Sequence, residues 1–415
     1  MSSTLDSSPS LPSLLLLPPP PSPVTSATLS AAYGTSITAT ASSLRNLSIG
    51  CQLLVVLPCP SLHSRLSLPR AQIYEEAQRL LSEIYSLISV VCAKLGIDVE
   101  AGTPGSIDAR VVLLDYSESF TLPGENDPMP TALTAGPIID LPTLALTRKQ
   151  WYKVFSVTGE EGQKLLADYR DLANRNSPLL LGHVELVDGG FRAIQTPTPV
   201  HAAIGSPTVH KVVAVGGTFD HLHAGHKLLL TATALLLQPD MAESQVNKRL
   251  IVGITGDQLL KNKKYAEYLG SWHTRQEDVI DFLLSVLSFT CSTREESIQT
   301  TEFDEPVPNG RAIHTRIKPC SITIECVEIQ DPFGPTVSDE SVTALVVSAE
   351  TRSGGQAVND RRLERGWKAL EVFEVDVLDA EDVGGGSGKT EDFASKISST
   401  AIRKRRADIA RGSWL

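Results

Sequence analysis

The stretch VGGTFDHLHAGHKLLL, residues 215–230, opens with groups that suit close contact with a phosphate-bearing ligand. Gly216 and Gly217 allow a tight turn and a close approach of the backbone, because glycine has no Cβ atom. Thr218 adds a hydroxyl at the same point, and Phe219 completes the turn that we expect to border the ligand. This combination predicts a binding turn at the end of a strand.

Two histidines follow this turn. His223 and His226 flank Gly225 at the predicted start of a helix, where unpaired backbone N–H groups and the helix dipole favour phosphate. Because the histidines are three residues apart, both rings lie on one face once the helix begins. A single histidine is more often structural, but the pair beside a Gly-Gly-Thr turn favours binding. We therefore predict that His223, Gly225 and His226 bind the phosphates of a nucleotide.

A second phosphate-binding pattern lies in SKISSTAIRKR, residues 395–405. One of Ser398, Ser399 and Thr400 can cap a helix that begins just after them, and the other hydroxyls then lie at the positive end of its dipole. Arg403 projects one turn later from the same face as Ser399. Hydroxyls, a helix N-terminus and a guanidinium together predict a phosphate site.

Three lysines follow another predicted strand, in LLKNKKY: Lys261, Lys263 and Lys264. A lysine cluster is as often a solvated loop. The position of this one at the carboxyl edge of a sheet favours a role for one or two of the lysines in holding the phosphate of a second substrate. Their spacing leaves open which side chain points inward.

The elements that position these residues alternate along the chain beyond residue 210. Strands that alternate with helices predict a parallel sheet covered on both faces, with ligands at the carboxyl ends of the strands where the strand order reverses. The predicted strands are 211–217, 249–255, 321–329, 343–348 and 371–378, and the predicted helices are 226–237, 274–289 and 359–370. We therefore predict an α/β fold with a Rossmann-like parallel sheet.

Composition divides the chain into four segments. Residues 1–48 are rich in Ser and Pro with few charges, which predicts disorder. Residues 50–195 combine strand-like runs with an amphipathic helix at 72–97, which predicts a small α/β domain with no catalytic constellation of its own. Residues 196–209 contain prolines and form a predicted linker, and residues 210–415 form the domain that carries the site.

The overall composition excludes several classes of protein. The net charge of −11 argues against general nucleic-acid binding, although local lysines and arginines can still attract a small polyanion. No apolar run reaches the roughly 18 residues of a membrane helix, and SLLLLPPPPSP lacks the basic start of a signal peptide. The six cysteines form no C-x-x-C pair. We expect a soluble cytoplasmic protein without a metal site built from its own side chains.

The histidine pattern resembles the HxGH signature of the nucleotidyltransferase α/β superfamily. Within it, the stretch VGGTFDHLHAGHKLLL is most similar to the eukaryotic type of pantetheine-phosphate adenylyltransferase. HxGH and ISSTxIR mark only the superfamily, whereas blocks with NKK, DPFGPT and VVSAET narrow the resemblance to this family. The resemblance covers residues 210–411, about half of the chain, and its further blocks lie in family order at residues 252–275, 328–336, 344–355 and 395–405.

The resemblance implies transfer of AMP from ATP to 4'-phosphopantetheine, with Mg²⁺ bridging phosphate oxygens. It implies that His226 stabilises charge on the α-phosphate and that His223 holds the ATP phosphates. Thr218 with Lys263 or Lys264 would position the acceptor phosphate, and Ser399, Thr400 and Arg403 would grip the β- and γ-phosphates. The expected catalytic residues are His226, His223, Lys263 and Arg403, and the expected binding residues are Gly216, Gly217, Thr218, Phe219, His223, Gly225, His226, Lys264, Ser398, Ser399, Thr400 and Arg403. Further candidates on the ATP side are Arg352, Asn359, Arg361 and Arg362.

A different nucleotide motif is imitated by GGGSGKT, residues 384–390. A P-loop requires glycine five positions before the Gly-Lys pair, where this chain has Val383, and it links a strand directly to a helix. Glu391 and Asp392 would also repel phosphate. The segment is better interpreted as a flexible Gly-rich linker.

Three alternatives remain open. An NMN adenylyltransferase shares ISSTxIR but has a GxFNP-type first motif, and a cytidylyltransferase would carry a block like RTEGISTT. The third alternative is a nucleotide-binding scaffold, because the N-terminal half has no assigned role. That half could contact other enzymes of coenzyme A synthesis.

Overall fold

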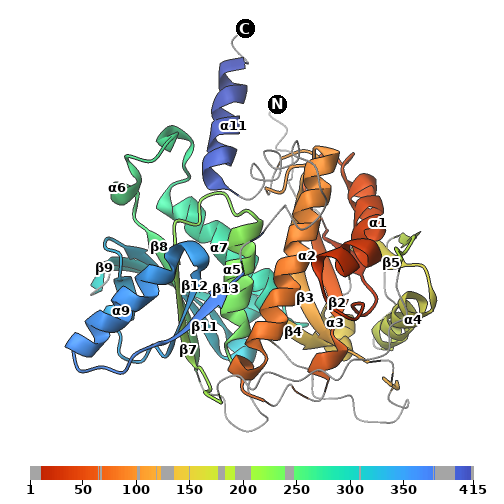
Figure 1. Ribbon diagram of the computed structural model, residues 1–415, viewed down its shortest axis with the longest axis horizontal. Coiled ribbons are helices and arrows are strands. Elements are labelled where there is room, and N and C mark those ends of the chain that lie inside the picture. Colours follow the sequence, from red (N-terminus) through yellow and green to blue (C-terminus); the bar gives the residue numbers. More distant parts are fainter. Residues whose placement is uncertain are drawn as a thin grey trace.

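The computed structural model describes residues 11–63, 65, 68–100, 103–117, 119–122, 135–148, 150–175, 183–191, 207–238, 247–307, 310–376, 378 and 398–412. Two sheets, each covered by helices, form the two halves of the chain (Figure 1). The predicted α/β fold with parallel sheets is confirmed.

The N-terminal half is a parallel sheet with strand order β4-β3-β2-β1-β5-β6. Its strands are β1 (Ser13–Leu16), β2 (Cys51–Pro58), β3 (Ile107–Asp115), β4 (Ile138–Asp140), β5 (Val154–Val157) and β6 (Val184–Val187). Its helices are α1 (Ser26–Leu44), α2 (Tyr74–Leu95), α3 (Leu141–Thr147) and α4 (Glu160–Asn174). Helix α2, predicted as 72–97, ends at Gly96, whose φ of 67° permits the left-handed cap.

The predicted disorder of residues 1–48 is wrong for residues 11–48, and residues 1–10 lie outside the described part of the chain. Leu14 to Leu17 are fully buried, and β1 lies between β2 and β5 in the middle of the sheet. Helix α1 begins with a capping box formed by Thr25 and Thr28. Its Ser, Ala and Thr side chains are small enough to pack closely against α2. The low charge of this segment reflects burial rather than disorder.

The C-terminal half is a sheet with strand order β13-β12-β7-β8-β11-β10-β9, in which β9 and β10 are antiparallel to their neighbours and the others are parallel. Its strands are β7 (Val212–Gly217), β8 (Lys248–Thr255), β9 (Ile298–Val307), β10 (Gly310–Ile317), β11 (Ile322–Ile329), β12 (Ala344–Ser348) and β13 (Glu371–Val375). Its helices are α5 (Ala224–Leu235), α6 (Asp257–Leu260), α7 (Trp272–Leu287), α8 (Arg294–Ser297), α9 (Arg352–Glu364) and α11 (Ser399–Gly412).

The strand order reverses at β7, whose neighbours are β8 on one side and β12 on the other. Ligands of parallel α/β sheets bind beyond the carboxyl ends of strands at such a reversal. The turn that begins at Gly216 therefore lies where the sequence predicted a site. Helix α9 begins seven residues earlier than predicted. The prediction started the helix too late because Gly354 and Gly355 lie in its first turns and glycine disfavours helix.

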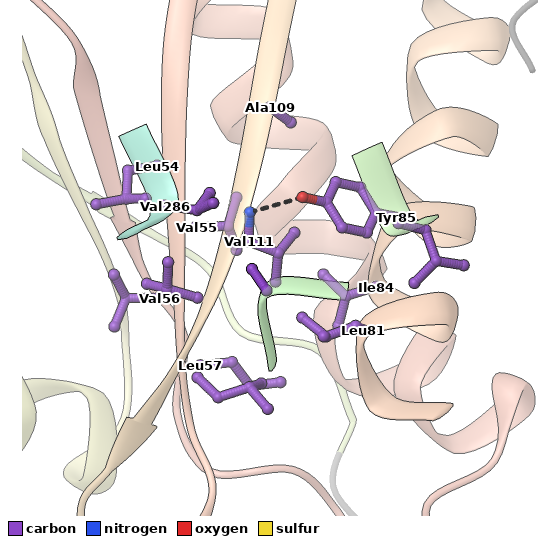
Figure 2. Close-up of a cluster of buried hydrophobic side chains, with 14 of the residues drawn as sticks. Leu54, Val55, Val56, Leu57, Leu81, Ile84, Tyr85, Ala109, Val111 and Val286 are labelled. Atoms are coloured by element: carbon purple, nitrogen blue, oxygen red, sulfur yellow. Dashed lines mark hydrogen bonds between the residues drawn. The ribbon is translucent and has the colours of Figure 1, made fainter. Parts of the chain in front are cut away.

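The two halves share one hydrophobic core. Figure 2 shows Val286 of α7, in the C-terminal half, among Leu54, Val55 and other side chains of the N-terminal sheet. Helices α2 and α5 pack side by side at the boundary (Figure 1). Tyr85 of α2 lies 3.3 Å from the Thr231 hydroxyl of α5 and also accepts the backbone N–H of Val111. Of the predicted linker at 196–209, the structure describes only residues 207–209, so this prediction is not tested.

The described helices include none that is both long enough and apolar enough to cross a membrane.

Candidate active site

The turn between β7 and α5 has a constrained backbone. Phe219 and His221 both adopt a φ of 50°, in the left-handed region that residues with a side chain rarely occupy. Such strain is concentrated at functional sites, where the surrounding structure maintains it. At Gly217 a Cβ atom would lie 3.0 Å from the buried Phe219 ring, so glycine leaves room for that ring. Gly216 is exposed, so its backbone is accessible to a ligand.

Helix α5 begins directly after this turn, with His223 as its N-cap and no side-chain hydrogen bond to the cap. The first backbone N–H groups of a helix have no acceptor within it, and they carry partial positive charge. A Cβ atom on Gly225 would lie 3.2 Å from the His223 ring, so glycine leaves room for that ring at the helix start. This terminus presents donors that suit phosphate oxygens.

The rings of His223 and His226 stack with their centroids 3.9 Å apart and an interplanar angle of 23°. Among the described residues, the buried Nδ1 atom of each ring has no hydrogen-bond partner. Burial, followed by the charge of His226, lowers the pKa of His223 well below its usual value. Burial also lowers the pKa of His226 to about 4, although Asp220 opposes this shift. Both imidazoles are therefore neutral near pH 7 in the free protein, and unsatisfied buried nitrogens of this kind are prepared for a ligand.

The lysines that follow β8 differ in position. Lys263 Nζ lies 3.4 Å from the Thr218 hydroxyl, so this side chain reaches the turn after β7. Lys264 is exposed, and its backbone carbonyl accepts a hydrogen bond from Arg403. Lys261 is exposed and no hydrogen bond joins its side chain to the described turn. The geometry thus singles out Lys263 as the lysine beside Thr218.

The predicted clamp at the start of α11 lies beside the same turn. Ile402 donates its backbone N–H to the Ser398 carbonyl, which makes Ser398 the first capping residue. The Ser399 hydroxyl donates to the Asp220 carbonyl at 2.7 Å. Thr400 is exposed, and its hydroxyl accepts from Arg403 at 3.2 Å. The structure therefore brings the N-terminus of α11 to the turn that precedes α5.

Arg403 is buried rather than open to a ligand, with 2% exposure. Its Nη1 pairs with Asp220 Oδ2 at 2.5 Å, and its Nε donates to the Lys264 carbonyl at 3.1 Å. These contacts tie α11 to the turn before α5 and to the lysine loop. A direct contact of Arg403 with phosphate stays a prediction.

Two residues of this region escaped the sequence analysis. Arg275, 1% exposed, donates to the backbone carbonyls of Thr218 at 2.6 Å and Thr255 at 2.8 Å, and so fixes the ends of β7 and β8 relative to each other. Asp220, fully buried, accepts the Gly270 N–H at 3.1 Å as well as the Arg403 pair. The sequence does show a charged residue, Asp220 or Arg275, inside each motif block. It does not show that the charge is buried or which residue it pairs with.

The further ATP-side candidates have contacts within the protein. Arg362 donates to several backbone carbonyls, and Asn359 pairs with the backbone of Leu370. Arg352 and Arg361 form surface ion pairs with Glu374 and Glu364. A contact of any of these four residues with ATP stays a prediction.

The GGGSGKT segment at 384–390 lies outside the described residues, so the prediction of a flexible linker there is not tested. Within the described part of the chain, no group of three or more His, Cys, Asp or Glu side chains is arranged to hold a metal ion.

Comparisons with known proteins divide the chain in the same way as the two sheets. A family model described as cytidylyltransferase-like matches residues 214–405, and one described as a domain of unknown function (DUF8446) matches residues 1–193. An uncharacterized protein of Schizosaccharomyces pombe is 35% identical over 207 residues, which are 50% of this chain and 51% of that protein.

Two further relatives carry an enzyme name. The phosphopantetheine adenylyltransferase of Saccharomyces cerevisiae is 34% identical over 193 residues, 46% of this chain and 48% of that protein. The phosphopantetheine adenylyltransferase of Pyrococcus abyssi is 30% identical over 193 residues, 46% of this chain and 88% of that protein. The chain therefore spans about half the length of the two yeast relatives and most of the archaeal one. Given the match over residues 214–405 and the identity to the archaeal enzyme along most of its length, the chain belongs to the cytidylyltransferase-like family of nucleotidyltransferases, as a homologue of phosphopantetheine adenylyltransferases.

Proposed function

We propose that the protein transfers AMP from ATP to 4'-phosphopantetheine, forming dephospho-CoA and pyrophosphate. The observation that carries this proposal is the stacked pair His223 and His226, whose buried Nδ1 atoms lack partners among the described residues at the N-terminus of α5. The names of the Saccharomyces cerevisiae and Pyrococcus abyssi relatives support 4'-phosphopantetheine as the acceptor. We also propose that the protein is of the eukaryotic type of this enzyme, because its motif blocks are similar to those of that type.

The proposed reaction is an in-line displacement at the α-phosphorus of ATP. A phosphate oxygen of the acceptor forms the new P–O bond, and the bond to the bridging oxygen of the β-phosphate breaks, so that pyrophosphate leaves with the electron pair. A phosphate monoester is already anionic near neutral pH, so no general base is needed. The site instead has to bring two anions together, which repel by about 4 kcal/mol per pair of unit charges at ~4 Å and an effective dielectric of ~20.

The residues around the turn divide this task. Neutral His226 donates a hydrogen bond to the α-phosphate as charge develops there, and His223 with the first N–H groups of α5 holds the phosphates of ATP. Thr218 and Lys263 lie 3.4 Å apart and bind the acceptor phosphate. Lys264 adds positive charge at the same edge.

The N-terminus of α11 binds the β- and γ-phosphates through Ser399 and Thr400, and Arg403 holds that terminus in place through Asp220. Mg²⁺ would enter bound to ATP as part of the substrate and would supply positive charge at its phosphates.

The test is pyrophosphate release by the full chain with Mg·ATP, measured in parallel with 4'-phosphopantetheine and with NMN as acceptor. A third reaction replaces ATP by CTP. We expect one dephospho-CoA for each pyrophosphate with ATP and 4'-phosphopantetheine, and rates at least about 100-fold lower in the other two reactions. Faster turnover with NMN or CTP would reject this substrate assignment.

A further inference from the structure

A carboxylate of the N-terminal half joins the two phosphate-binding elements of the C-terminal half. Glu100 lies between α2 and β3 and is 5% exposed. Its Oε1 accepts from Arg405 Nη2 at 3.1 Å, and its Oε2 accepts from Arg406 Nη2 at 2.5 Å. The same Oε2 lies 3.6 Å from His221 Nδ1. His221 belongs to the turn before α5 and both arginines belong to α11, so one side chain bridges the two elements.

Neighbouring carboxylates of the N-terminal half strengthen this connection. Asp98 accepts from Arg405 Nη1 at 2.6 Å. Asp108 of β3 accepts from Lys227 Nζ at 2.5 Å, and the same ammonium donates to the Val99 carbonyl at 3.2 Å. Lys227 is buried and directly follows His226 in α5. Both helices that begin at the nucleotide site are therefore anchored by acids that lie outside the family match at residues 214–405.

These ion pairs border a pocket between the two halves that is partly open to solvent. The pocket has a volume of about 90 Å³ and is lined by acids and bases from both halves, including Glu100, Asp108, His221, Lys227 and Arg406. Although burial opposes it, the charges of Arg110 and Lys227 lower the pKa of Asp108 to about 2, so this carboxylate is ionised at neutral pH. A buried ion pair that loses one partner leaves an uncompensated charge, so each pair constrains the position of its helix.

The position of these helices matters because phosphate transfer depends on geometry. Small displacements of catalytic groups, of about 1 Å, can reduce a rate by about 100-fold. The ion pairs that Asp98, Glu100 and Asp108 form with the C-terminal half reach only neighbours of the phosphate-binding residues, so these acids act through α5 and α11 rather than on the substrate.

We propose that the N-terminal half completes the nucleotide site, with Glu100 and Asp108 as positioning residues that set the distance between the N-termini of α5 and α11. This inference rests on the proposed function only in taking a nucleoside triphosphate as the ligand between those termini. It gives the N-terminal half a role in ATP binding.

The test compares Mg·ATP binding by the full-length wild type and the Glu100→Gln variant, using titration calorimetry without an acceptor. We expect Glu100→Gln to raise the Kd for Mg·ATP by about tenfold. In steady-state assays, the KM for ATP should rise similarly while the KM for the acceptor stays within about twofold. A purely structural role would instead change both KM values together with the thermal midpoint.

The matched control is Asp168→Asn. Asp168 accepts from Tyr116 at 2.7 Å and from Lys164 at 2.9 Å, so this variant also loses an ion pair of the N-terminal half but touches neither α5 nor α11. We expect its Kd for Mg·ATP to stay within about twofold of the wild type. An equal weakening in both variants would overturn the proposal.

A second variant keeps the test decisive if Glu100→Gln does not fold. Arg406→Gln removes the same contact from a side chain that is 42% exposed, and it should weaken Mg·ATP binding several-fold. The double variant Glu100→Gln/Arg406→Gln should bind no more weakly than Glu100→Gln alone, because Glu100→Gln has already removed the ion pair that Arg406→Gln breaks. Binding of Mg·ATP within twofold of the wild type in these variants, or no binding by the wild type, would overturn the inference. Normal ATP binding without dephospho-CoA formation would reject only the proposed function.

Discussion

His226 is the residue at which chemistry and folding can be separated. Its ring stacks on His223 and its Nδ1 has no described partner, so its removal costs the fold little. We expect His226→Ala to lower kcat/KM for adenylyl transfer by about 100- to 1,000-fold, the usual effect of losing one donor to a developing negative charge. Pyrophosphate release measures the rate, and circular dichroism checks the fold. Turnover within threefold of the wild type would remove His226 from the mechanism.

The low pKa of His226 also predicts a pH dependence of stability. The pKa is about 4 in the folded protein and near 6.5 in the unfolded chain. Between these values the unfolded chain binds more protons, so the folded state loses stability as the pH falls from 6.5 towards 4. From pH 7 to pH 5, wild type should lose about 1–2 kcal/mol more than His226→Gln. Urea unfolding at both pH values measures this difference, and parallel losses in the two proteins would contradict it.

At the residue scale, the placement of groups could be predicted from the sequence where the groups are neighbours in the chain. The Gly-Gly-Thr turn and the two histidines form one feature of neighbouring residues, and the structure places them together at the end of β7. Arg275 and Asp220 were missed because their partners are brought near only by tertiary folding. The lysine beside Thr218 was left open for the same reason, since side-chain direction in a loop depends on the packing around it.

At the scale of elements, the start of α5 has little room for a side chain at Gly225. We expect Gly225→Ala to weaken ATP binding, because the new methyl group would lie 3.2 Å from the His223 ring and displace it. Stability should remain equal or rise by up to about 1 kcal/mol, since alanine favours helix over glycine. The KM for ATP and the thermal midpoint measure the two effects.

Gly354→Ala is the matched control for this change, because a Cβ atom at Gly354 of α9 would meet nothing within 4 Å. It should stabilise the protein without altering the KM for ATP. If Gly225→Ala and Gly354→Ala have the same KM for ATP, the position of the His223 ring does not affect ATP binding.

Strands and helices of the C-terminal half could be predicted because β-branched runs and amphipathic periods are local signals. The strand and helix before residue 50 could not be predicted in this way. Leu14–Leu17 form a short run followed by prolines, and α1 is composed of residues typical of linkers. Their burial depends on α2 and on β2 and β5, which are distant in sequence.

At the scale of the whole molecule, the shared core predicts that the C-terminal half does not fold by itself. A fragment of residues 207–415 would expose the face of α5 that packs on α2 and would leave Lys227 without Asp108. We expect this fragment to lack a cooperative unfolding transition and to bind Mg·ATP at least about tenfold more weakly. A monodisperse fragment with a sharp transition and full activity would contradict the prediction. Contact of the N-terminal half with other enzymes of coenzyme A synthesis stays a prediction.

The central claim is that one triphosphate lies between the N-termini of α5 and α11. A crystal structure of the full chain with Mg²⁺ and a non-hydrolysable ATP analogue tests it most directly. We predict phosphate oxygens within hydrogen-bond distance of His226 and of the Ser399 or Thr400 hydroxyl in the same complex. A triphosphate bound elsewhere, or one that contacts α5 while α11 stays out of reach, would contradict the account.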